Sequence, residues 1–266
     1  MPHQYAWEDY FIPGTQTLKN LFGLVDPEEL RTNEEDTVAS RMLELQTAPV
    51  PGTFDLTHIR ALHQHLFQDI YGWAGEVRTA PSADQSPMSK DGVAYAPVDR
   101  IAPIWTTERA RIAKKPTLLR GSSSAADFST RLARFWGEIN HAHAFREGNT
   151  RTQVMFFEQL CEHAGYSLDI ARLAPQHPET LREAFVDARY YFQLRGDAMP
   201  LAETITQVLT PLTKQTAVDP PQTAVLKASL DSQEQNRRFP ELRYVQLDPY
   251  GLSEESPAQN DDSQLS

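Results

Sequence analysis

HAHAFREGNTRTQ, residues 141–153, places two histidines, an acidic residue, a Gly-Asn pair and an arginine directly before an apolar run. Gly148 permits positive φ and close approach of other groups to its backbone, and Asn149 also tolerates the left-handed conformation. A helix is predicted to follow at once, so its unpaired N–H groups would face the loop. Arg151 lies in the first turn, where a cation opposes the helix dipole unless an anion is bound. The stretch therefore predicts an anion site at a loop-to-helix junction.

Helical patterns bracket this loop on both sides. Upstream, residues 121–140 carry apolar side chains at helical spacing behind Ser124, a typical N-cap, with Asp127 as the capping-box acid. Downstream, residues 152–165 repeat the pattern and should end at Gly165. The same criterion predicts further helices over residues 28–46, 56–71, 179–194 and 201–210. The expected fold class is mostly α.

One segment interrupts the helices. Residues 78–97 contain Lys90-Asp91-Gly92 between two short segments, and Asp-Gly is a strong turn signal. A small β-hairpin is predicted there.

Composition sets the domain organisation. Hydrophobic residues make up 40% of the 266 residues, which is enough for one sizeable core. From about residue 214 the chain becomes rich in Pro, Gln, Ser and Asp, with too little apolar surface to offset the entropy lost on ordering. We expect an N-terminal extension over 1–29, a main domain over 30–213 and a mostly disordered tail over 214–266.

Charge and cysteine content restrict the partners and the compartment. The net charge of −11 argues against direct binding to nucleic acid or to an anionic membrane surface. Cys161 is the single cysteine, the first residues lack a secretory signal pattern, and no apolar run approaches the roughly 20 residues that span a bilayer. We expect a cytoplasmic protein without membrane association, with proteins or small anions as partners.

The residues of the loop indicate a reaction class. Glu147 is a carboxylate suited to Mg²⁺, which takes its other ligands from phosphate oxygens and water. Together with the anion site it suggests a nucleotide polyphosphate. His143 can accept a proton near neutral pH, an effect worth about 10²–10⁴-fold when the base is well placed. Phosphoryl or nucleotidyl transfer onto a hydroxyl is one interpretation. An ordinary loop, with Arg151 paired to Glu147 or Glu158 and His143 in the core, is the other.

Longer stretches resemble a known family. HAFREGNTR resembles the Fic motif, whose general form is HxFx(D/E)GNGRxxR. LHQHLFQDIYGWAGEVRT (62–79) resembles the segment before the flap of Fic proteins, and MSKDGVAYAP (88–97) resembles the flap hairpin. ARYYFQLRGDAMPLAETITQVL (188–209) resembles the helix pair that closes the nucleotide site. The resemblance implies a helical Fic fold and a protein adenylyltransferase, which transfers AMP from ATP to a Tyr, Thr or Ser hydroxyl of a target protein.

The resemblance also implies residue roles. His143 would be the general base, Phe145 a buried anchor of the loop and Glu147 the ligand of Mg²⁺. The implied catalytic residues are His143, Glu147, Asn149 and Arg151, and the implied ATP- or anion-binding residues are Gly148, Asn149, Thr150 and Arg151. ATP is the expected substrate and Mg²⁺ the expected metal.

The resemblance further implies two kinds of protein partner. The flap residues Met88, Ser89, Lys90, Val93 and Tyr95 would dock an extended segment of the target by strand addition. In the family, an inhibitory (S/T)xxxE(G/N) helix neutralises the second arginine of the motif. The only Glu-Gly here is Glu147-Gly148, inside the motif itself. Restraint would therefore come from a small antitoxin partner, consistent with a toxin or with an effector delivered to a host cell.

Three motif positions depart from the family pattern: Ala144 replaces a common proline, and two further changes matter more. Thr150 replaces a glycine, and its β-branched side chain narrows the anion hole and disfavours positive φ. The related Doc toxins have lysine there and act as kinases. Val154 replaces the second arginine, which removes a charge-assisted contact worth roughly 1.5–3 kcal/mol. The alternatives are therefore a Doc-like protein kinase and a degenerate Fic fold that only binds a protein.

Overall fold

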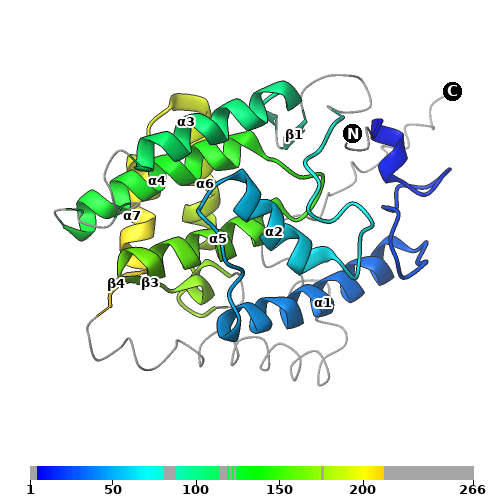
Figure 1. The fold of residues 1–266 in the computed structure, drawn as a ribbon, viewed down its shortest axis with the longest axis horizontal. Coiled ribbons are helices and arrows are strands. Elements are labelled where there is room, and N and C mark those ends of the chain that lie inside the picture. Colours follow the sequence, from blue (N-terminus) through cyan, green and yellow to red (C-terminus); the bar gives the residue numbers. More distant parts are fainter. Residues whose placement is uncertain are drawn as a thin grey trace, which may run out of the picture.

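The computed structural model describes residues 5–80, 88–90, 92–113, 119, 122, 124–174 and 177–212, and helices form most of this described part. The helices are α1 (Pro27–Thr47), α2 (Leu56–Phe67), α3 (Ile101–Ala113), α4 (Ala125–Ala142), α5 (Asn149–Ala164), α6 (Arg182–Arg195) and α7 (Met199–Gln207) (Figure 1). Short 3-10 turns cover Trp7–Tyr10, Val98–Arg100 and Ile170–Leu173. The strands are β1 (Ser89–Lys90), β2 (Val93–Ala94), β3 (Tyr166–Leu168) and β4 (Leu209–Pro211).

The helix boundaries follow local signals in the sequence. The Ser124 hydroxyl accepts a hydrogen bond from the Asp127 N–H at 3.1 Å, so the predicted cap of α4 is confirmed. Helix α5 ends at Ala164, directly before Gly165 as predicted. The helix predicted over 56–71 is shorter, because the N–H groups of Ile70 and Tyr71 both bond to the Phe67 carbonyl and the chain turns there.

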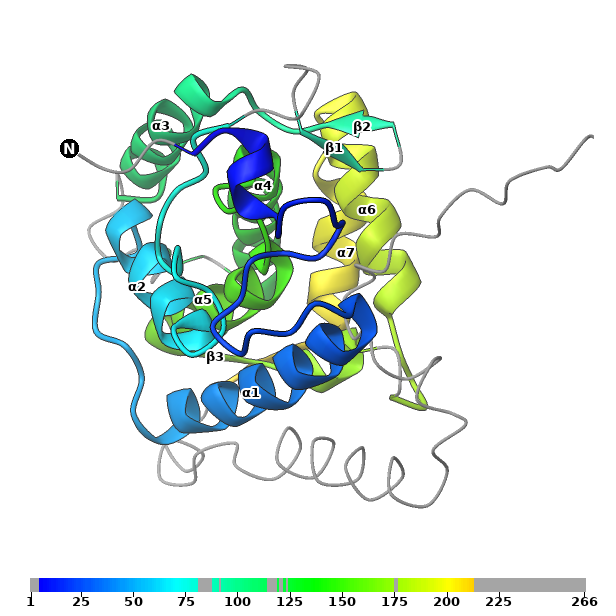
Figure 2. The same cartoon turned by 90° about the vertical axis from the view of Figure 1, so that its right-hand side faces the viewer.

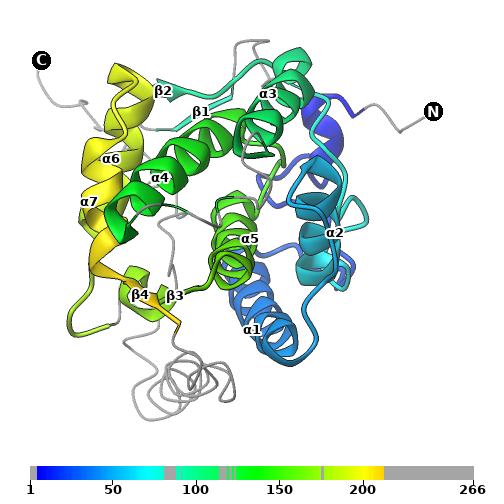
Figure 3. The ribbon, with the colours of Figure 1, turned by 60° about the vertical axis from the view of Figure 1, so that its left-hand side comes forward.

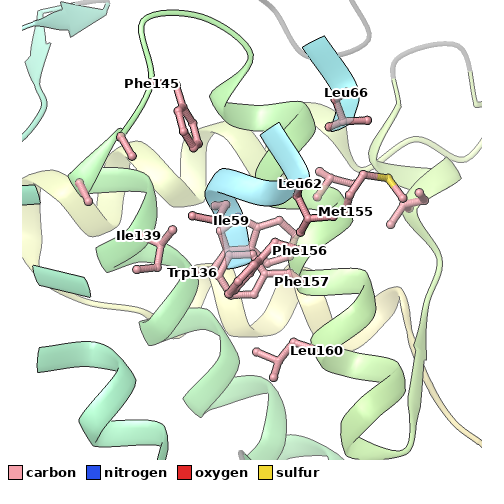
Figure 4. Packing of buried hydrophobic residues seen from close by; sticks show 14 of the residues in the cluster. Ile59, Leu62, Leu66, Trp136, Ile139, Phe145, Met155, Phe156, Phe157 and Leu160 are labelled. Carbon is pink, nitrogen blue, oxygen red and sulfur yellow. The ribbon is translucent and has the colours of Figure 1, made fainter. Parts of the chain in front are cut away.

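Helix α5 lies at the centre of the fold. Figure 3 shows it between α4 on one side and α1 and α2 on the other. Every residue from 149 to 158 is buried, so this part of α5 is enclosed all round instead of presenting one apolar stripe. Side chains of α2 and α4 point towards those of α5 (Figure 4), and the Trp136 and Phe157 rings stack at 4.4 Å. Each such large side chain contributes about 1.5–3 kcal/mol on burial.

The hairpin predicted from the Asp-Gly turn is confirmed. Strands β1 and β2 pair antiparallel, with Ser89 opposite Ala94 and Lys90 opposite Val93. The hairpin lies beside α6 (Figure 2). A second pair, β3 with β4, joins the end of α5 to the end of α7.

The described N-terminal residues pack on the same body as the domain predicted to begin at residue 30. Tyr10 is buried and its ring meets that of Trp73 edge-on at 5.6 Å. The Tyr5 N–H donates to the Thr79 hydroxyl at 2.7 Å. The predicted tail, residues 214–266, lies outside the described residues, and the predicted domain limits stay predictions. Among the described residues, no helix has the length and apolar character needed to cross a membrane.

Candidate active site

The loop between α4 and α5 has two residues with positive φ. Gly148, at +76°, adopts the conformation that the sequence predicted for it. His143, at +42°, is the C-cap of α4, a left-handed conformation that non-glycine residues rarely adopt and that the sequence did not predict. Thr150 lies inside α5 and is not among the positive-φ residues, so its β-branched side chain meets no backbone conflict there.

Asn149 closes this loop on itself. Its Oδ1 accepts from the Phe145 N–H at 2.9 Å, and its Nδ2 donates to the Phe145 carbonyl at 2.7 Å. Phe145 is 1% exposed, which confirms the buried anchor predicted for it. Because both amide atoms of Asn149 are used inside the loop, its side chain holds the shape of the junction. The predicted anion-binding roles of Gly148, Asn149 and Thr150 stay predictions.

His143 is buried beside the flap. Its imidazole stacks on the Tyr95 ring with 3.6 Å between centroids, and His143 is 7% exposed. Burial is the main reason that the pKa of His143 lies well below its usual range, and the positive charges of Arg78 and Arg189 lower it further. The imidazole is therefore neutral at neutral pH, with a lone pair able to accept a proton.

Arg78 ties three segments together at this point. Its side chain donates to the carbonyls of His143 at 2.7 Å and Ala96 at 2.6 Å, and its backbone N–H donates to Ala144 at 2.9 Å. The guanidinium lies at the C-terminus of α4, where a cation is favoured by the helix dipole. Arg78 thus fixes both the base of the flap and the unusual backbone of His143. Sequence reasoning gave it no role.

Arg151 is held by acidic side chains. It forms an ion pair with Glu34 of α1, and Glu147 lies at 3.4 Å. The Tyr71 hydroxyl donates to the other oxygen of Glu34. Of the partners considered from the sequence, Glu147 is present, while the principal partner, Glu34, was missed. The available signal was its position: Leu30, Glu34 and Val38 share the buried stripe of α1, and an acid on such a stripe needs a partner.

The Glu147 carboxylate accepts a hydrogen bond within the loop and is also partly exposed to solvent. Its Oε1 accepts from the Gly148 N–H at 2.8 Å, while its side chain is 22% exposed. Burial, and next the charge of Glu34, raise the pKa of the Glu147 carboxyl. In the described part of the chain, no group of three or more His, Cys, Asp or Glu side chains is placed to hold a metal ion.

His63 of α2 supports the loop from behind. Its Nδ1 accepts from the Gly75 N–H at 2.8 Å, so its proton is on Nε2, which donates to the Glu147 carbonyl at 3.1 Å. Its ring also stacks on Phe145 at 3.9 Å. Burial lowers the pKa of His63 to about 3. A neutral imidazole therefore bridges the Glu147 backbone to the segment before the flap.

We expect His63→Phe to lower the free energy of unfolding by about 2–4 kcal/mol, because it keeps the ring but leaves two buried backbone groups without partners. His65→Phe, a change at a partly exposed position of the same helix, is the control and should cost under about 1 kcal/mol. Urea unfolding measures both variants. Equal costs for the two substitutions would contradict the support that we assign to His63.

Comparison of wild type with His63→Phe at different pH values tests whether His63 is neutral in the folded protein. Between pH 6.5 and about 3, the unfolded chain protonates His63 while the folded chain does not, so this residue makes stability fall as pH falls. The difference in stability between wild type and His63→Phe should shrink by up to about 1.4 kcal/mol per pH unit in that window. A constant difference would show that His63 is not held neutral.

The flap places its five predicted docking residues in different environments. Val93 and Tyr95 are buried, whereas Ser89 is exposed and Met88 and Lys90 are half-buried. Within the described residues, β1 and β2 pair only with each other, which leaves the outer edges of the hairpin without strand partners. Such edges allow strand addition by main-chain hydrogen bonds. Target docking by this hairpin stays a prediction.

The site combines a glycine loop, a neutral histidine and an acidic residue at the start of one helix, an arrangement suited to a nucleotide-using transferase. Comparison with known proteins identifies the family. The Fic/DOC family model matches residues 53–161. The chain is 35% identical over 198 residues to the probable protein adenylyltransferase y4lH of Sinorhizobium fredii, covering 74% of this chain and 93% of that relative. The chain belongs to the Fic/DOC family, as the motifs predicted.

Other relatives support the same assignment. The protein adenylyltransferase VbhT of Bartonella schoenbuchensis is 33% identical over 80% of this chain, which spans 41% of VbhT. A solved structure of the N-terminal Fic domain of a putative cell filamentation protein from Bartonella quintana, with bound ADP, has a TM-score of 0.69 at 27% identity. That similarity covers 81% of this chain and 100% of the solved one. The predicted mostly α Fic fold with its hairpin is confirmed.

Proposed function

We propose that this protein is a protein adenylyltransferase that moves AMP from ATP to a Tyr, Thr or Ser hydroxyl of a target protein. The hydroxyl oxygen bonds to the α-phosphorus, the bond from that phosphorus to the bridging oxygen breaks, and pyrophosphate leaves. The hydroxyl proton goes to His143. The observation that carries the proposal is a neutral, buried histidine at the loop that opens onto the N-terminus of α5. Relatives of this chain are named protein adenylyltransferases or probable protein adenylyltransferases.

Mg²⁺ fits the acidic residue of the loop. It needs only one or two carboxylates from a protein when phosphate oxygens complete its shell. Glu147 is partly exposed, and a bound cation would offset the burial and the charge of Glu34, which raise the pKa of its carboxyl. Bound there, Mg²⁺ would neutralise phosphate charge. The Gly148 N–H and the His63 contact keep Glu147 in place for that role.

Phosphoryl transfer is the second candidate reaction, suggested by Thr150 because the Doc toxins, which act as kinases, also have another residue in place of glycine at this position. The side chain at this position lies 3.5 Å from the Arg189 guanidinium, so the anion site differs from one lined by glycine. A different site can hold ATP in a different orientation. A protein that binds its partner without modifying it is the remaining alternative. Restraint by a small antitoxin and delivery to a host cell remain proposals; proteins with similar structures are described as translocated Bartonella effectors.

ATP labelled separately at the α- or γ-phosphate distinguishes these reactions. The purified protein is incubated with bacterial lysate and Mg²⁺, and labelled proteins are resolved by gel autoradiography. Adenylyl transfer predicts protein-bound signal from the α label alone. Signal from the γ label alone would replace adenylyl transfer by the kinase reaction, and absence of both signals would favour the binding protein.

A further inference from the structure

Arg189 is a buried cation close to the loop. It belongs to α6, is 7% exposed, and its guanidinium lies 4.5 Å from the Phe185 ring. Its Nη1 donates weakly to Asn140 Oδ1 at 3.4 Å and to Thr150 Oγ1 at 3.5 Å. Its Nε is buried without a hydrogen-bond partner. The side chain therefore reaches the first turn of α5 with much of its hydrogen-bonding capacity unused.

Within the described residues, Arg189 forms no ion pair, and no carboxylate is among the groups that affect its pKa, although buried charges are normally paired. Burial lowers the pKa of the Arg189 guanidinium to about 10, and the charge of Arg182 lowers it further. The side chain therefore remains charged at neutral pH. An uncompensated buried cation is costly unless an anion binds to it.

Arg151 differs in this respect. Glu34 and Glu147 already compensate its charge. Position 154, where the Fic motif has its second arginine, holds a valine that is fully buried in the core. Of these three positions, Arg189 alone offers a positive charge that the protein has not neutralised.

We propose that Arg189, together with the Thr150 hydroxyl and the first-turn N–H groups of α5, binds a phosphate group of the nucleotide. The first N–H groups of a helix have no intrahelical partners and favour an anion, and a guanidinium is the side chain best shaped for phosphate. Arg189 thereby supplies the charge that Val154 does not. The inference rests on the proposed use of ATP. It gives Thr150, which contacts this arginine, a role in binding the same phosphate.

Nucleotide binding tests the inference apart from catalysis. Binding of ADP and of adenosine is measured by calorimetry without Mg²⁺, for wild type and for Arg189→Gln, Arg189→Lys and Arg195→Gln. Arg195 lies on the same helix and is exposed, so it is the matched control. We expect Arg189→Gln to weaken ADP binding about 10- to 100-fold, since it removes a hydrogen bond from a charged donor to phosphate. Adenosine binding should be unchanged, Arg189→Lys should weaken ADP less, and Arg195→Gln should have no effect.

The stability of the free variant supplies a second measurement. Removing an uncompensated buried cation should leave the unfolding midpoint of Arg189→Gln unchanged or raised. Unchanged ADP affinity in Arg189→Gln would overturn the inference, and so would an equal loss of ADP and adenosine affinity, which indicates a general packing role. Wild-type protein that binds no ADP also overturns it. Selective loss of ADP binding, in a protein that transfers no AMP, would uphold the phosphate contact and refute the proposed reaction.

Discussion

Replacement of His143 by alanine is expected to lower the rate of AMP transfer by about 10²–10⁴-fold, the usual contribution of a well-placed general base. The imidazole is neutral because burial and two nearby arginines disfavour its protonated form. It can therefore accept the hydroxyl proton over the whole neutral range. Initial rates of α-label incorporation into the target measure the loss. ATP affinity should change little, because the proposed phosphate contacts come from other residues.

His163→Ala is the matched control, because His163 lies near the opposite end of α5 and its ring contacts Phe54 at 5.2 Å. This variant should transfer AMP at the wild-type rate after correction for any loss of folded protein. If His143→Ala keeps more than about a tenth of the wild-type rate, another group must accept the proton, and the central assignment would fail. A large loss of ATP affinity in His143→Ala would instead place the histidine in binding.

The parts of the fold that follow from local chemistry could be predicted from the sequence. Ser124 is recognisable as an N-cap, Gly148 as a residue with positive φ and Gly165 as a helix end. Each of these features depends only on residues within three or four positions. The hairpin follows from an Asp-Gly pair in the same way. The motif then located the loop, because its residues are consecutive in the chain. Local order and close spacing are what periodicity and turn rules detect.

The missing parts of the site depend on long-range packing. Glu34 and Arg151 are 117 residues apart, Arg78 and His143 are 65 apart, and Thr150 and Arg189 are 39 apart. Each pair meets only because α1, the segment before the flap or α6 packs against the loop. No local pattern specifies such a partner. The stacking of Tyr95 on His143 also arises from tertiary contact, whereas the sequence assigned Tyr95 only to the target-docking surface.

Gly148→Ala is expected to lower the free energy of unfolding by about 2–5 kcal/mol. A left-handed conformation costs an alanine about 1–2 kcal/mol, and overpacking of a core typically adds about 1–3 kcal/mol. Both costs apply here, since φ is +76° and a Cβ would lie 2.2 Å from Cζ of Phe67. Phe67 is fully buried and its ring cannot move away freely. Urea unfolding gives the free energy, and AMP transfer should fall as well because the loop would be displaced.

Gly196→Ala separates the two costs. Gly196 has φ of +71°, but a Cβ there would meet nothing within 4 Å, so only the conformational cost of about 1–2 kcal/mol applies. Phe67→Leu removes the ring atoms that the new methyl group would meet. In the Phe67→Leu background, the loss in free energy of unfolding caused by Gly148→Ala should fall to the loss caused by Gly196→Ala. A double-mutant cycle measures this coupling between positions 67 and 148 directly. Equal costs for the two glycine substitutions in the wild-type background would show that the loop does not rest against Phe67. The close contact between the Gly148 backbone and this ring would then not be what fixes the loop against the core.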